Sequence, residues 1–289
     1  MITITIIHSC FYILLAAGVH CIYHWGGRLF LGGLGIVAFS SYFACWLVEQ
    51  GLPSWLALIL VGITGVLVVV AIGEILAGSS ALVYAVFTFA LVLCAVKLAG
   101  FPNPLTNGDA GINSPFWATA NRTGDDRLTP ILAIISVAIA LVSYEILQRK
   151  GAFRYAELLA QSPLLATSLG LKPIEARLPT HVFAGLMFSL SGIVCVFKFQ
   201  LIQPSIFSCG TSFLTLLIGF LVPRNRSWLL LGYGLVLVLL RLLIQAWTLD
   251  RATQLAGVIV GLLTLVIVLR LWRTPILPLK RLQFGKRTA

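Results

Sequence analysis

The chain has 289 residues, of which 59% are hydrophobic and 10% are charged. Soluble globular proteins carry about 25% charged residues, so this composition excludes an ordinary soluble domain. The formal net charge is +11, which in a soluble protein would suggest a nucleic-acid partner. Here the basic residues fall mostly between apolar stretches, so we expect contact with membrane lipid and no nucleic acid.

Apolar runs long enough to cross a bilayer recur along the whole chain. A spanning helix needs about 20 residues, and by this criterion the sequence predicts an all-α integral membrane protein, a polytopic bundle of about nine transmembrane helices. All of them belong to a single transmembrane domain, residues 1–289. The second run is rich in glycine, so we expect it to be broken or re-entrant. The predicted spans are residues 5–23, 29–48, 55–76, 81–99, 129–147, 178–197, 206–222, 228–248 and 252–271.

Two polar segments interrupt this pattern. Residues 100–128 are rich in Pro, Asn, Gly and Asp, and we expect an irregular outer loop. Residues 148–177 contain a stretch without glycine, 153–169, which is followed by Gly170 in the position of a helix C-cap and by Pro173. We therefore predict a short helix outside the membrane over 153–169. Two roles for its apolar face remain open: packing on the protein's own helix ends, or docking into a partner's groove. That face holds Leu158, Leu159, Leu165 and Ala166.

The distribution of Lys and Arg predicts the orientation. Cytoplasmic loops carry an excess of these residues. The basic residues of segment 148–177, of the turn at 223–227 and of the C-terminal tail all fall on the side of Arg28. We expect that side to be the cytoplasm, with the N-terminus outside and the C-terminus inside. Lys97 is the exception, and its long side chain can reach outward from a helix end.

The sequence offers little for catalysis or metal binding. The cysteines lie nearly all in apolar runs without C-x-x-C spacing, and no His-Glu-x-x-His pattern occurs. His20 and His24 share one face of the first predicted span, where a polar side chain tends to face a cavity or another helix. We therefore expect no metal, no cofactor and no enzymatic activity, and an intramembrane enzyme is disfavoured because no nucleophile or carboxylate pair is evident in the spans.

Short motifs then follow one another in a recognisable order. The stretch 27–33, G-R-L-F-L-G-G, followed by Tyr42, is similar to a G-Q-L-S-L-G-H…Y signature, and 105–112 is similar to L-T-G-G-x-x-G-L. Residues 166–171 are similar to A-E-A-L-G-I, and 189–192 to part of A-G-L-A-G. Next comes a P…F…S…V-L-G-G pattern, matched by Pro204, Phe207, Ser212 and 217–219. In this order the motifs resemble the branched-chain amino-acid permeases of ATP-binding cassette importers, and most of all their M-type subunit.

The resemblance implies a permease subunit in a bacterial inner membrane that imports branched-chain or related amino acids. Its partners would be two ATP-binding cassette ATPase subunits, a second permease subunit of the H type and a periplasmic substrate-binding protein. A permease for urea or short amides, or a membrane scaffold subunit that does not transport, are the alternatives. The chain would be a divergent member, because Arg28, Phe30 and Gly33 replace the Gln, Ser and His of the glycine signature.

The resemblance also implies two sets of functional residues. The first would line the substrate path, although its glycines would equally serve close helix packing: His20, Gly27, Gly32, Gly33, Tyr42, Ser191 and Ser212. The second would couple the permease to the ATPase through the helix of segment 148–177: Arg154, Glu157, Leu158, Leu165, Ala166 and Gly170.

Overall fold

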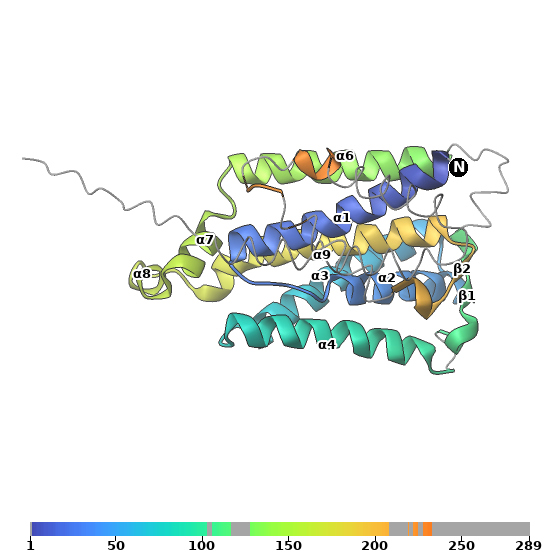
Figure 1. The fold of residues 1–289 in the computed structure, drawn as a ribbon, viewed down its shortest axis with the longest axis horizontal. Coiled ribbons are helices and arrows are strands. Elements are labelled where there is room, and N and C mark those ends of the chain that lie inside the picture. The colour runs from blue at the N-terminus through green and yellow to red at the C-terminus, as the bar shows by residue number, and fades with distance from the viewer. Residues whose placement is uncertain are drawn as a thin grey trace, which may run out of the picture.

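The computed structural model describes residues 2–102, 106–116, 128–207, 219, 222–224 and 228–232. This part of the chain is mostly helical, and most of its long helices lie side by side (Figure 1). The helices are α1 (Ile2–Gly26), α2 (Gly33–Glu49), α3 (Ser54–Ile75), α4 (Ala81–Gly100), α6 (Leu128–Arg149), α7 (Arg154–Gln161), α8 (Pro163–Ser168) and α9 (Pro173–Lys198). The short elements are the 3-10 turns η1 (Gly108–Ala110) and η2 (Pro204–Phe207) and the strands β1 (Ile112–Asn113) and β2 (Leu201–Ile202).

Helix α9 lies at the centre of the bundle and packs against α1, α2, α3, α6 and α7. Burial follows this arrangement, since 83% of the apolar window of α1 and 72% of that of α9 are buried, against 33%, 22% and 28% for α3, α4 and α6. The outer helices therefore expose large apolar side chains such as Leu67, Leu82 and Ile139. Such surfaces are unfavourable in water and suit lipid tails, because a helix satisfies its own backbone hydrogen bonds.

Five helices of the described chain, α1, α3, α4, α6 and α9, are long and apolar enough to cross a membrane. They cover five of the predicted spans, and the predicted spans 206–222, 228–248 and 252–271 lie almost wholly outside the described residues. The second predicted span begins later than expected, because residues 27–32 are not helical and α2 starts at Gly33. Gly27, whose φ is 64°, marks the end of α1. Helix α9 begins earlier than expected, at Pro173, since proline is well suited to the first turn of a helix.

The single helix predicted over 153–169 is wrong in one respect, because the structure divides it into α7 and α8. Pro163 has no N–H to donate and restricts the residue before it. Ser162 accordingly leaves the helical region, with φ −147° and ψ 82°, and Pro163 starts the next helix. The end of α8 agrees with the prediction: Gly170 has φ 77°, and its N–H donates to the carbonyl of Thr167 at 3.0 Å.

The two ends of the bundle differ. At one end, on the left of Figure 1, lie the last turn of α1, the α3–α4 turn, the end of α6, the pair α7–α8 and the start of α9. We call this the basic end, because it holds Arg28, Arg149, Lys150, Arg154, Lys172, Arg177 and Arg224. At the other end β1 pairs antiparallel with β2, with Ile112 opposite Ile202. This pairing anchors part of the predicted outer loop to the chain that follows α9.

Candidate functional site

The helical pair α7–α8 presents one buried and one exposed apolar face. Leu159 of α7 and Ala166 of α8 are buried against Ala176 of α9. On α8 and just after it, Leu164, Leu165 and Leu169 are 86%, 49% and 63% exposed, and we call these three residues the α8 leucine surface. Thr167 and Ser168 of the same stretch are exposed as well. Large apolar side chains gathered at a surface are typical of an interaction site.

The predicted coupling residues therefore divide between the two faces. Leu158 and Ala166 pack inside the protein, whereas Leu165 is exposed. The structure thus shows packing on the protein's own helices for part of the segment, and docking into a partner's groove stays a prediction for the exposed Leu165. Sequence reasoning missed Leu164 and Leu169, although Pro163, which separates α8 from α7, was visible in the sequence.

Glu157 fixes α7 to the rest of the basic end. Its carboxylate pairs with Arg224, whose Nη1 donates to Oε1 at 2.5 Å, and Gln161 donates to the same oxygen at 3.0 Å. The Arg224 guanidinium also lies over the ring of Trp25 on α1, 3.9 Å from its centroid. Arg224 in turn accepts a hydrogen bond at its carbonyl from the side chain of Gln148 at 3.1 Å. The ion pair thus connects α7 with the ends of both α1 and α6.

Arg154, the other charged residue of the predicted coupling set, lies at the start of α7. It is exposed, and its backbone N–H donates to the carbonyl of Gly151 at 3.0 Å. The side chain leans over Gly151, where an added Cβ would lie 2.8 Å from its Nε. The Arg154 side chain therefore lies at the surface, at the first residue of α7.

His20 and its neighbours form a buried polar cluster between α1 and α6. His20 Nδ1 lies 2.8 Å from the hydroxyl oxygen of Tyr144, and Trp25 Nε1 donates to the same oxygen at 3.0 Å. His20 and Tyr144 are both fully buried. His20 therefore faces another helix, one of the two expected surroundings. Sequence reasoning missed Tyr144, whose signal was a polar aromatic residue inside the fifth predicted span.

The remaining predicted pathway residues make close contacts between helices. A Cβ on Gly33 would lie 2.8 Å from Phe188, and one on Gly32 would lie 3.1 Å from the carbonyl oxygen of Thr88. Ser191 donates to the carbonyl of Phe11 at 3.1 Å, and Tyr42 donates to that of Ile202 at 3.4 Å. Ser212 lies outside the described residues. In this conformation these contacts join α2 to α9 and β2, α9 to α1, and the residue before α2 to α4.

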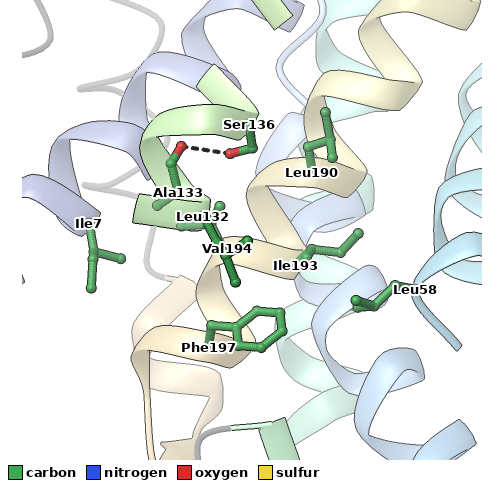
Figure 2. Close-up of a pocket in the computed structure, with 9 residues that line it drawn as sticks. All are labelled: Ile7, Leu58, Leu132, Ala133, Ser136, Leu190, Ile193, Val194 and Phe197. Atoms are coloured by element: carbon green, nitrogen blue, oxygen red, sulfur yellow. Dashed lines mark hydrogen bonds between the residues drawn. The ribbon is translucent and has the colours of Figure 1, made fainter. Parts of the chain in front are cut away.

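An apolar groove lies nearer the strand end, with a volume of about 190 Å³. Figure 2 shows that apolar side chains line it, with one polar exception, Ser136. The Ser136 hydroxyl donates to the carbonyl of Ala133 at 2.7 Å, so it is already paired. A groove of this composition suits a hydrocarbon chain and offers no partner for the charged groups of an amino acid. Its lining comes from α1, α3, α6 and α9: Ile7, Leu58, Leu132, Ala133, Ser136, Leu190, Ile193, Val194 and Phe197.

A second cavity, of about 200 Å³, lies at the basic end, and we call it the arginine cavity. It includes Gly27 of the predicted pathway set and two arginines, Arg28 and Arg177. Burial lowers the pKa of Arg28, and the positive charge of Arg177 lowers it further. The lining is Gly26, Gly27, Arg28, Ser79, Ala81, Ala156, Leu159, Ala160, Pro163 and Arg177.

Comparison with known proteins adds no family to this description. No family model, no curated protein and no solved structure matches the chain.

Proposed function

We propose that this membrane protein is the permease subunit of an ATP-driven importer for branched-chain or related amino acids. The α8 leucine surface carries the proposal. It is an exposed apolar surface on a short helix outside the membrane-length helices, and it sits on a segment that is firmly packed against the bundle. An ATPase groove that accepts an amphipathic helix would bury these leucines.

Contacts within the described chain offer a route from that surface to the membrane helices. Ala166 of α8 and Leu159 of α7 pack on α9, the central helix of the bundle. Gly27 at the end of α1 lies against Ala160 of α7. A force on α8 would therefore act on both buried helices, α1 and α9. In the proposed mechanism, ATP-driven closure of the ATPase moves α7–α8 and reorients these helices, and the permease itself performs no chemistry.

The proposal includes an orientation and partners. The basic end faces the cytoplasm of a bacterial inner membrane, which puts the N-terminus outside and, with nine spans, the C-terminus inside. The complete importer would hold two ATP-binding cassette subunits, an H-type permease and a periplasmic binding protein. Urea or a short amide is an alternative substrate in the same class. A scaffold subunit without transport is distinguished by uptake that persists when this chain is deleted.

The test replaces Leu164 and Leu165 with Glu in one variant and with Met in a matched control. The chain is co-expressed with two ATP-binding cassette ATPase subunits from the same genome, and recovery of ATPase and amino-acid uptake are measured. We expect the Glu variant to lose both, because it places charge where the groove requires apolar contact, and the Met control to keep both. Gel filtration of each variant confirms folding. Unchanged ATPase recovery and uptake in the Glu variant would contradict the proposal.

A further inference from the structure

The described residues that line the arginine cavity include two arginines and no acid. Arg28 comes from the linker after α1 and Arg177 from the first turns of α9, and both side chains line the same space. The acid whose charge acts on Arg28 is Glu74, near the end of α3. Among the described residues it makes no ion pair within 4 Å with either arginine. Two guanidinium groups that repel each other are stable together when an anion lies between them.

Arg28 is held in place by the end of α3. Its Nη1 donates to the carbonyl of Leu76 at 2.8 Å and its Nη2 to that of Ala77 at 2.7 Å. Its guanidinium also lies 5.3 Å from the centroid of the Tyr84 ring. A cation at a helix C-terminus is favourable, which accounts for this placement. The side chain is therefore fixed before any ligand binds, and this lowers the entropy cost of binding.

Arg177 has hydrogen-bonding capacity left over. Its Nη1 is buried and, within the described part of the chain, has no hydrogen-bond partner. An unpaired buried donor on a charged group is costly, so proteins rarely leave one without a hydrogen-bond partner. A phosphate oxygen is a suitable acceptor, because a guanidinium binds phosphate through charge-assisted hydrogen bonds.

We propose that the arginine cavity binds the phosphate group of an anionic phospholipid, held between Arg28 and Arg177. The cavity lies where α1, α3, α4 and α9 begin or end, which is the level of lipid headgroups if these helices cross the membrane. Basic pockets between transmembrane helices bind such headgroups. The apolar part of the lining, Gly27, Leu159 and Ala160, is suited to the glycerol and upper acyl groups of a lipid. This binding does not depend on the ATPase and goes beyond the proposed transport function.

A thermal-shift measurement on the purified full chain in detergent tests the proposal. Phosphatidylglycerol, zwitterionic phosphatidylcholine and inorganic phosphate are added separately. We expect phosphatidylglycerol alone to raise the unfolding midpoint of the wild type. Arg177→Gln should weaken the apparent affinity by about tenfold, since it removes a charged donor to phosphate. The matched control is Lys172→Gln, which removes an equal charge from an exposed side chain nearby, and it should keep its affinity within about twofold.

A second variant guards against a folding defect in Arg177→Gln. Ala160 is exposed on α7 and lines the cavity, so Ala160→Glu keeps both arginines and supplies a competing carboxylate. It should lower the affinity for phosphatidylglycerol as well. An unchanged response in either variant overturns the proposal. A shift that inorganic phosphate reproduces assigns the cavity to free phosphate and overturns the lipid. If these variants reduce ATPase recovery in the co-expression test but leave the lipid response unchanged, the arginines are assigned to a protein partner and the lipid proposal is overturned.

Discussion

Gly27 and Ala160 bring the first membrane-length helix into contact with α7. A Cβ on Gly27 would lie 2.8 Å from the Cβ of Ala160, and the φ of Gly27 is 64°. Two separate requirements therefore exclude a side chain at this position, namely the left-handed backbone and the lack of space. The contact also joins a residue expected in the substrate path to the segment expected to couple to an ATPase.

Gly27→Ala should destabilise the protein by about 1–3 kcal/mol, because it combines backbone strain with a clash against α7. The measurement is the midpoint of thermal unfolding in detergent. Gly170→Ala is the matched control, since Gly170 has φ 77° but no atom within 4 Å of an added Cβ. Gly170→Ala should lose less stability, because it introduces the backbone strain without the clash. Equal losses in the two variants would show that the contact with Ala160 adds nothing.

The Glu157–Arg224 ion pair should contribute more to stability than the exposed pairs of the same end. Its side chains are only 26% and 28% exposed, and Arg224 also stacks on Trp25. Glu157→Gln leaves that guanidinium without its counter-charge, so we expect a loss of about 1.5–3 kcal/mol. Chemical unfolding followed by tryptophan fluorescence measures it.

The control for this prediction is Glu175→Gln. Glu175 pairs with Lys172 at 3.2 Å, but the two side chains are 67% and 74% exposed. Water and salt screen such pairs, so the loss should stay below about 1 kcal/mol. A similar loss of unfolding free energy in both variants would mean that partial burial does not make the Glu157–Arg224 pair more stabilising than an exposed pair.

Gly185 and Gly62 test whether glycine serves close packing between α9 and α3. A Cβ on Gly185 would lie 2.7 Å from the Cα of Val66, which is backbone that cannot rotate away. Gly185→Ala should therefore cost about 1–3 kcal/mol through overpacking. Gly62→Ala meets nothing within 4 Å and should be neutral or stabilising by up to about 1 kcal/mol, because alanine favours helix. Equal changes in the midpoint of thermal unfolding for Gly185→Ala and Gly62→Ala would show that close packing at Gly185 does not matter.

The sequence predicted the long helices well because their signal is local. A run of about 20 apolar residues indicates a membrane-length helix whichever neighbours it packs against. The ends were less predictable. Pro163 changes the path of the backbone at a single position within a longer helical pattern, and it divides the predicted helix 153–169. The stretch after Gly27 is apolar and glycine-rich, yet residues 27–32 are not helical, so the predicted second span begins late.

The candidate site was less predictable because it depends on contacts between distant segments. Residue type marked His20 as a polar group facing a cavity or a helix, but the choice of Tyr144 as its partner depends on how α1 packs on α6. Likewise, Arg28 and Arg177 are far apart in the sequence and meet only because α1 ends and α9 begins at the same end of the bundle. Basic residues between apolar runs indicate topology, so no sequence pattern distinguishes these two arginines from the others.

The strand pairing at the opposite end makes the two ends of the molecule mechanically unequal. Ile112 and Asn113 pair with Ile202 and Leu201 through main-chain bonds, and Ser114 adds its own N–H to the carbonyl of Gln200 at 2.8 Å. Such a main-chain pairing depends little on the identity of the side chains in its strands. The basic end is instead held by contacts of individual side chains. Single substitutions in evolution can therefore change how tightly that end packs, while the strand pairing at the other end is kept.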